Sequence, residues 1–186
     1  MKQCRKLILG DKLHLTGRWD RYMQTIFVDW GGNNVKLTWM PRLKLTESLI
    51  VTSVHAVCFK DGKVLLAQIK NRGFNYPGGH VEIGEKVEEA ILRETYEEGY
   101  VKGTIKYIGS IEVSHKENLS FDSNGKYPLI AYQAFFRMDV TECLPFLREH
   151  ESSARIWVEP SEIPFVINDH KLSKLILDDA LTFCSS

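Results

Sequence analysis

The chain has 186 residues, of which 44% are hydrophobic and 26% are charged. These proportions are typical of soluble globular proteins, and the length allows one domain with a complete hydrophobic core. Lysine plus arginine equals aspartate plus glutamate at 24 each, so the formal net charge is zero. The overall charge therefore gives no support to a nucleic-acid or membrane partner, and a nucleotide substrate would need only a local basic pocket.

The cysteines and the first residues both bear on the compartment. Cys4, Cys58, Cys143 and Cys184 are widely spaced and form no C-x-x-C pair. Such spacing is typical of free thiols in a reducing compartment rather than of a zinc site. The apolar run at 7–9 is too short for a signal peptide or a membrane span. We therefore expect a cytoplasmic protein.

A β-hairpin is predicted near the N-terminus. Residues 21–30 and 35–40 are rich in β-branched and aromatic side chains, and they flank Gly31-Gly32-Asn33-Asn34, a turn signal. We expect a β-rich extension over residues 1–46 that packs on a core spanning 47–186. The hairpin is also a candidate contact for a homodimer.

Trp19, Trp30 and Trp39 all fall in this extension. One reading makes one of them a stacking platform for a base. The favoured reading is structural, with the tryptophans covering one face of a small sheet.

Two strands are predicted next, over 48–60 and 63–70, with Asp61-Gly62 as the turn between them. His55 in the first strand is interpreted as a packed or hydrogen-bonded core histidine rather than as a metal ligand. Arg72 lies in the loop that leads to the turn Pro77-Gly78-Gly79. Since a guanidinium can bind two phosphate oxygens at once, Arg72 is a candidate phosphate contact. An exposed loop residue is an equally good interpretation.

The stretch from Gly79 to Val101 has helical periodicity, and its apolar stripe continues into Glu94, Glu97 and Glu98. Like charges three or four residues apart cost roughly 0.2–0.5 kcal/mol per pair. The partial negative charge at the end of a helix disfavours them further. We infer that a cation lies against this face, and carboxylate ligands favour Mg²⁺ or Mn²⁺. The alternative is a solvated acidic face.

The spacing of these residues resembles the Nudix box. Gly79 is followed after five residues by Glu85, after seven more by Arg93-Glu94, and then by Glu97-Glu98. The resemblance implies an α/β/α sandwich of the Nudix type with a mixed β-sheet, and hydrolysis of pyrophosphate bonds with Mg²⁺ or Mn²⁺. Two positions depart from the box. Thr95 replaces an aliphatic residue, and the closing glycine comes one residue early, at Gly99, with Tyr100 in its usual place. We expect Gly99 to end the helix as a left-handed C-cap.

The rest of the chain reads mostly as strands. Residues 101–115 predict a strand bent near Gly109, and 128–140 predict another. The segment 141–153 is an acidic connection to a strand at 154–158. The C-terminal segment has helical periodicity, with Asn168 or Asp169 available as N-cap.

The resemblance also implies roles for the box residues. Glu94, Glu97 and Glu98 would hold the metal ions, together with the backbone carbonyl of Gly78. Arg93 would orient carboxylates through contacts with Glu89 and Glu97, or would form only a surface ion pair. Glu85 would have a supporting role.

The general base is left open between two carboxylates. Glu98 lies in the box beside the metal ligands, and a carboxylate there can take a proton from water. Glu151, with Glu149 close by, lies on the later connection as a further ligand or base. Solvated loop charge is the alternative for both of these later residues.

We therefore predict a hydrolase that cleaves a pyrophosphate bond in a nucleoside triphosphate or another nucleoside diphosphate-linked substrate, including oxidised purine nucleotides. The alternative is a catalytically idle Nudix fold that senses nucleotides or binds proteins. The presence of all three glutamates, Glu94, Glu97 and Glu98, favours the enzyme.

Overall fold

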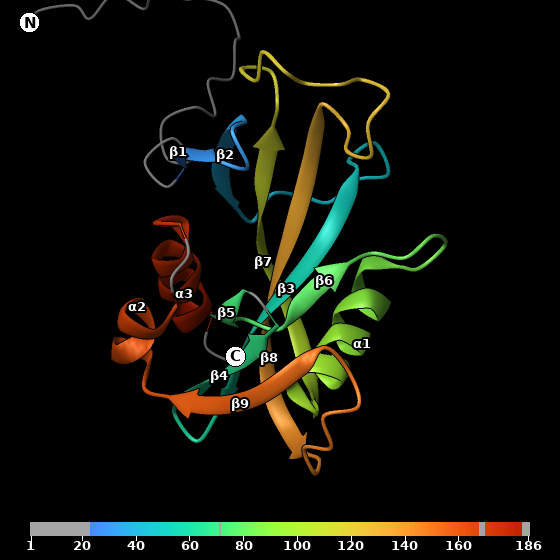
Figure 1. Cartoon of the computed structure of the whole chain (residues 1–186). Coiled ribbons are helices and arrows are strands. Elements are labelled where there is room, and N and C mark those ends of the chain that lie inside the picture. The colour runs from blue at the N-terminus through green and yellow to red at the C-terminus, as the bar shows by residue number, and fades with distance from the viewer. Residues whose placement is uncertain (1–22, 71, 168–169, 184–186) are drawn as a thin grey trace, which may run out of the picture.

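The computed structural model describes residues 23–70, 72–167 and 170–183. Figure 1 shows the elements, which follow one another in chain order. The strands are β1 (Gln24–Asp29), β2 (Asn34–Pro41), β3 (Val51–Lys60), β4 (Lys63–Ile69), β5 (Gly73–Asn75), β6 (Gly78–His80), β7 (Val101–Ser114), β8 (Ile130–Cys143) and β9 (Ser152–Val158). The helices are α1 (Val87–Gly99), the short 3₁₀ helix η1 (Pro160–Glu162), α2 (Ile163–Val166) and α3 (Leu172–Thr182).

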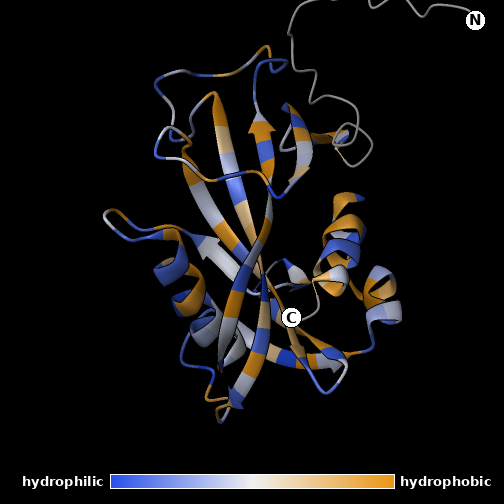
Figure 2. Ribbon diagram, turned by 180° about the vertical axis from the view of Figure 1, so that it is seen from behind, coloured by the Kyte–Doolittle hydropathy of each residue, from blue (hydrophilic) through white to orange (hydrophobic). Residues whose placement is uncertain are grey.

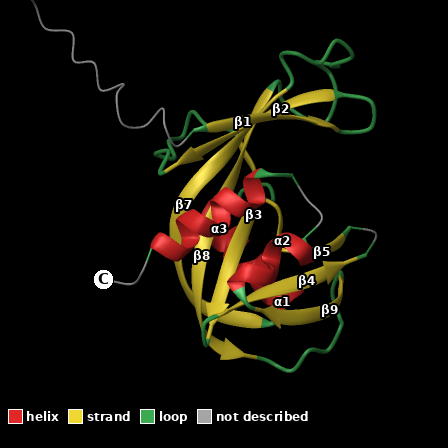
Figure 3. Ribbon diagram, turned by 90° about the vertical axis from the view of Figure 1, so that its left-hand side faces the viewer, coloured by secondary structure: helices red, strands yellow, loops and turns green. Residues whose placement is uncertain are grey.

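These strands form one mixed sheet in the order β1-β2-β7-β8-β3-β4-β5, with β6 beside β3 and β9 beside β4. The pair β3–β8 is parallel, and β2–β7 and β7–β8 are antiparallel. Helix α1 covers one face of the sheet, and α2 and α3 lie on the other (Figures 1 and 3). The predicted sandwich with a mixed sheet is therefore confirmed. Within the described ranges, every helix is too short or too polar to cross a membrane.

Strand β3 shows how the sequence builds the two layers. Val54, Ala56 and Cys58 are fully buried in a cluster that includes two residues of α1. Val57 and Phe59 face the opposite way, into the cluster that contains the buried face of α3. Successive side chains of a strand point to opposite faces, so an apolar run with few polar residues predicts burial on both sides. Figure 2 shows the alternation of hydrophobic and hydrophilic residues along the longer strands.

The N-terminal hairpin extends this sheet. Strands β1 and β2 pair from Gln24↔Trp39 to Asp29↔Asn34, and β2 pairs in turn with β7. Trp39 is fully buried, and its indole N–H donates to Asp179 Oδ2 of α3 at 2.6 Å. Trp39 therefore has the structural role expected of it. The division at residue 46 stays a prediction, and Trp19 lies outside the described residues.

Two predicted helix ends are wrong. Helix α1 includes Gly99, and the left-handed residue is Tyr100, with φ 52° and ψ 44°. Gly99 packs closely instead, since a Cβ there would lie 3.0 Å from Leu65 Cδ2 and the leucine side chain would have to shift. The N-cap of α3 is Lys171, whereas the expected Asn168 and Asp169 lie outside the described residues.

The bounds of the predicted connection 141–153 and the start of helix α1 also differ from prediction. Strand β8 continues to Cys143, so the first three residues of the predicted connection 141–153 belong to it. Helix α1 begins at Val87, whereas the box glycine Gly79 lies in β6. The predicted bend of β7 is present as a register shift between Tyr107 and Gly109.

Candidate active site

The acidic residues at the end of α1 are buried. Ala90 and Ile91 pack on the sheet with no exposed surface, and one turn later the same face carries Glu94 and Glu98, which are 9% and 5% exposed. The side chain of Glu97 is 33% exposed. A solvated acidic face therefore does not describe Glu94 or Glu98.

The glycine turn before α1 fits closely against these carboxylates. The backbone N–H of Gly78 donates to Glu98 Oε2 at 2.9 Å. A Cβ on Gly79 would lie 2.4 Å from Glu94 Oε1, which is closer than any real Cβ contact. Glycine at position 79 thus leaves the space that the Glu94 carboxylate occupies. The two ends of the box meet at one place because β6 lies beside α1.

Arg93 contacts three glutamates of the Nudix box. Its Nε and Nη2 bind both oxygens of Glu85, each at 2.9 Å, and Nη1 contacts Glu94 Oε1 at 2.8 Å and Glu97 Oε2 at 3.2 Å. The hydrogen bond from Arg93 is the main reason that the pKa of Glu85 lies below its usual value. Glu85 therefore supports Arg93 from outside the helix.

One predicted partner of Arg93 is wrong. Glu89 accepts the N–H of Lys86 at the start of the helix instead. The fourth group that Arg93 reaches is the backbone carbonyl of His80, at 3.0 Å from Nη2. Arg93 therefore orients Glu94 and Glu97 and also fixes the loop after β6.

The carboxylates line a cavity of about 580 Å³. Two arginines, Arg72 and Arg93, lie on its wall, together with six glutamates: Glu82, Glu94, Glu97, Glu98, Glu149 and Glu151. The structure thus brings Glu149 and Glu151 of the later connection, and Arg72 of the earlier loop, to the box. A divalent cation in this cavity would compensate the excess of negative charge.

The pKa values of the two buried glutamates reflect this environment. The pKa of Glu98 is raised from 4.5 to about 8, chiefly by burial and also by the charges of Glu94 and Glu151, against the hydrogen bond from Gly78 and the charge of Arg72. Burial also raises the pKa of Glu94, against the hydrogen bond from Arg93. Both carboxyl groups are therefore protonated more readily than an ordinary glutamate when no cation is present.

The donor set fits Mg²⁺ or Mn²⁺, because these ions prefer carboxylate oxygens and retain several water ligands. Within the part of the chain that the structure describes, no three acidic, histidine or cysteine side chains are already close enough together to form a metal site. Instead, Glu98 accepts a hydrogen bond from the backbone N–H of Gly78, and Glu94 accepts one from Arg93. Binding of a cation would require these carboxylates to reorient.

Tyr100 has a role that the sequence did not suggest. Its hydroxyl accepts the backbone N–H of Glu149 at 2.7 Å, and its ring packs edge-on against Phe146, with centroids 5.0 Å apart. Arg155 of β9 donates to the carbonyls of Gly99 and Tyr100, at 2.7 and 3.1 Å, and also to Leu144. The end of α1 thereby holds the loop that carries Glu149 and Glu151.

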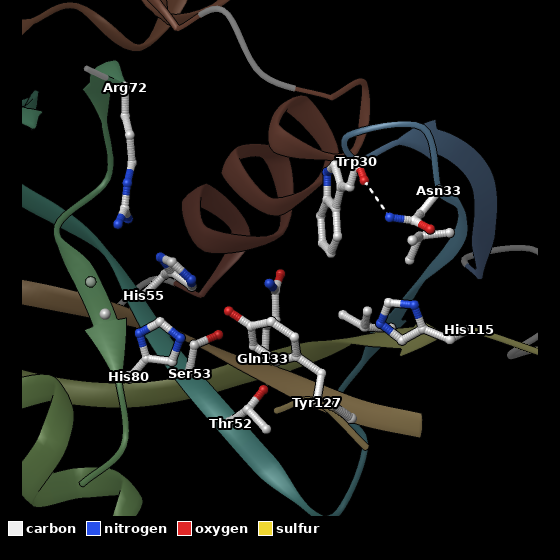
Figure 4. Close-up of a pocket in the computed structure, with 15 residues that line it drawn as sticks. Trp30, Asn33, Thr52, Ser53, His55, Arg72, His80, His115, Tyr127 and Gln133 are labelled. Carbon is white, nitrogen blue, oxygen red and sulfur yellow. Dashed lines mark hydrogen bonds between the residues drawn. The ribbon is translucent and has the colours of Figure 1, made fainter. Parts of the chain in front are cut away.

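A second cavity, of about 420 Å³, adjoins the acidic one (Figure 4). The two cavities share Arg72, Gly78, Gly79 and His80 on their walls. His55 is half-buried and lines the second cavity, and its ring stacks on Phe135 with centroids 5.1 Å apart, so it packs at the edge of the core rather than within it.

Comparison with known proteins decides the family. The NUDIX domain profile matches residues 50–178. The chain belongs to the Nudix family. The match begins just before β3 and ends within α3, so the hairpin β1–β2 precedes the part of this Nudix chain that matches the profile.

Individual relatives agree with this Nudix assignment. The chain is 43% identical over 67 residues to the putative 8-oxo-dGTP diphosphatase YtkD of Bacillus subtilis, covering 36% of this chain and 42% of that protein. It is 30% identical over 118 residues to the CTP pyrophosphohydrolase of Escherichia coli, covering 61% of this chain and 78% of that protein. For three curated relatives, including YtkD, the chain spans only 30% to 46% of the relative's length.

Solved structures show the same Nudix fold. The crystal structure of a mutant of the Bacillus subtilis pyrophosphohydrolase BsRppH matches with a TM-score of 0.65 at 21% identity, covering 86% of this chain and 97% of that one. At this identity the similarity shows the fold alone.

Proposed function

We propose that this chain is a Mg²⁺- or Mn²⁺-dependent hydrolase that cleaves a pyrophosphate bond in a nucleoside triphosphate or a related nucleotide. The observation that carries the proposal is the buried pair Glu94 and Glu98, in a cavity whose wall also includes Arg72. An acidic cavity excludes a bare anion, but it suits an anion that arrives with divalent cations. The activities for which YtkD and the CTP pyrophosphohydrolase are named support the same class of substrate.

The proposed ligands of the cation are Glu94, Glu97, Glu98 and the backbone carbonyl of Gly78. A divalent cation there would neutralise phosphate charge and acidify a water molecule. Arg93 holds Glu94 and Glu97 in position, and Arg72 contacts phosphate oxygens at the mouth of the cavity. Exposure of Arg72 suits this role, since the side chain can move onto an incoming phosphate.

The reaction needs a carboxylate to accept a proton from the attacking water. Water attacks one phosphorus, the bridging P–O bond breaks, and the products are a nucleoside monophosphate and a phosphate-containing group. Glu98 and Glu151 are the two candidates for the base, and both line the cavity. A base must be ionised, and a neighbouring cation favours the ionised form of Glu98.

A substrate panel tests the proposal. Formation of the nucleoside monophosphate is measured with Mg²⁺ for 8-oxo-dGTP, dGTP, GTP, CTP and ADP-ribose. The wild type is compared with Glu98→Gln and with Glu88→Gln, which removes one exposed carboxylate from the first turn of the same helix. We expect turnover of at least one nucleotide by the wild type and by Glu88→Gln, and a loss of about a hundredfold or more for Glu98→Gln. Nucleotide binding without turnover by any of the three proteins would favour the idle binding module.

A further inference from the structure

The second cavity has the composition of a site for an aromatic ring with polar edges. Trp30 and Tyr127 line it with side chains that are 43% and 50% exposed. Figure 4 shows the indole of Trp30 and the amide of Gln133 pointing toward one another, with Ser53, His55 and His80 together at the end formed by β6. Binding sites of this kind combine flat apolar surfaces with a few polar groups that fix orientation.

Ser53 provides an independent observation. It is only 9% exposed, and its Oγ has no hydrogen-bond partner among the residues that the structure describes. Buried hydroxyl groups are normally paired, and an unpaired one needs an explanation. Because Ser53 lines the cavity, a ligand that donates or accepts one hydrogen bond there would supply the missing partner.

The two cavities differ in the charge of the residues that line them. Six glutamates line the first cavity, whereas no acidic side chain of the described residues lines the second. A ligand that spans both would therefore have an anionic, cation-bound part in the first and a neutral part in the second. Arg72 lies on both walls, at the junction where phosphate would lie. A nucleoside polyphosphate has this division of charge.

We propose that the second cavity binds the base of the substrate, that Trp30 of the N-terminal hairpin stacks on it, and that Ser53 hydrogen-bonds its edge. This inference rests on the proposed function for the identity of the phosphate part. The base is a purine, because a two-ring indole gains more contact from a two-ring base than from a pyrimidine. Trp30 lies outside residues 50–178, so the stacking surface comes from the extension, whereas Ser53 lies in the part that matches the family profile.

The variant Trp30→Ala suits a test because the turn does not depend on the indole. The hydrogen bonds that hold the turn join the backbone of Trp30 to the backbone and side chain of Asn33. Phe27 provides the matched control, since it lies on the same hairpin, is 55% exposed and does not line the cavity. For Ser53→Ala the matched control is Ser152→Ala. Ser152 Oγ is also buried without a hydrogen-bond partner in the described part of the chain, but it lies in β9.

The experiment measures kcat and KM with Mg²⁺ for GTP, ATP, CTP, UTP and inorganic tripolyphosphate. We expect Trp30→Ala to raise KM for the two purine nucleotides about ten- to a hundredfold, and Trp30→Phe to raise it less, because a ring remains. Tripolyphosphate has no base, so its kinetics should not change. Ser53→Ala should raise KM for a purine nucleotide while Tm stays equal or rises. Phe27→Ala and Ser152→Ala should leave all KM values unchanged.

Binding of GMP and AMP by calorimetry, without metal, separates this inference from the proposed function. If the wild type hydrolyses no substrate, the proposed function fails, and a loss of GMP binding in Trp30→Ala would still support the base site. If the wild type hydrolyses purine nucleotides but Trp30→Ala leaves their KM and the GMP affinity unchanged, the base site is refuted. A preference for CTP and UTP over the purine nucleotides would also overturn it.

Discussion

Replacing Glu98 with glutamine should stabilise the metal-free protein at neutral pH. Burial holds the folded-state pKa of Glu98 at about 8, against 4.5 for an ordinary glutamate. Because the folded value is the higher one, this group costs no stability below pH 4.5, and its cost grows as the pH rises and becomes complete above pH 8. Glutamine is neutral at every pH, and its carbonyl can accept the N–H of Gly78.

The size of the stability cost follows from the difference between the folded and unfolded pKa values of Glu98. One pKa unit is worth about 1.4 kcal/mol, and pH 7 lies two and a half units above the unfolded value, so the cost at pH 7 is about 3 kcal/mol. This is an upper figure, because water entry and side-chain movement reduce it. We therefore expect Glu98→Gln to unfold at a higher urea concentration than the wild type at pH 7, and at nearly the same concentration at pH 5.

The assay is urea unfolding in EDTA at several pH values between 5 and 8, repeated with Mg²⁺. Glu88→Gln serves as the control, because Glu88 is exposed on the same helix and its loss should change stability by only a few tenths of a kcal/mol. Mg²⁺ at high concentration should reverse the order, since a metal at a thousand times its Kd adds about 4.1 kcal/mol to the protein that binds it, which exceeds the cost of about 3 kcal/mol. A stability difference between Glu98→Gln and wild type that does not grow between pH 5 and pH 8 would refute the reasoning.

Three further predictions follow from the contacts around the acidic cavity. Gly79→Ala should weaken metal binding at least tenfold, measured by Mn²⁺ titration, because its Cβ would lie 2.4 Å from Glu94 Oε1; unchanged affinity would contradict this. Arg93→Lys keeps the charge but loses the fork on Glu85, so both Mn²⁺ affinity and kcat should fall; equal affinity would mean that Arg93 does not orient the carboxylates. Tyr100→Phe removes the acceptor of the Glu149 N–H and should cost about 1 kcal/mol and lower kcat more than it raises KM. The control is Tyr96→Phe, since Tyr96 is 42% exposed, and an equal effect of the two would exclude positioning of the loop by Tyr100.

The parts of the site that one helix carries could be predicted from the sequence, because helical periodicity is local. The stripe that runs from Ala90 and Ile91 into Glu94 and Glu98 requires that all four face the sheet, and all four are buried. Arg93 was predicted to contact Glu97 by the same rule and does so. Glu89 was not its partner, because the helix begins at Val87 and the first-turn backbone N–H groups compete for its carboxylate.

The parts that depend on distant strands could not be predicted. Glu151 reaches the box because β9 pairs with β4, a pairing that no local pattern encodes. Both Trp30 and Trp39 belong to the predicted hairpin strands, yet Trp39 is fully buried and Trp30 is 43% exposed beside a cavity. Their difference arises from the pairing of β2 with β7 and from the contact of Trp39 with α3.

Tyr100 takes part both in the local end of helix α1 and in contacts with a distant loop. A tyrosine in the left-handed region costs of order 1–2 kcal/mol compared with the glycine usual at this position of the box. The buried ring and the hydroxyl bond to Glu149 offset that cost, and the glycine at 99 leaves room for Leu65. The one-residue shift of the glycine therefore does not displace the acidic residues. It exchanges a conformationally free C-cap for a side chain that fixes the loop bearing Glu151, so the departure from the box is itself part of how this chain assembles its site.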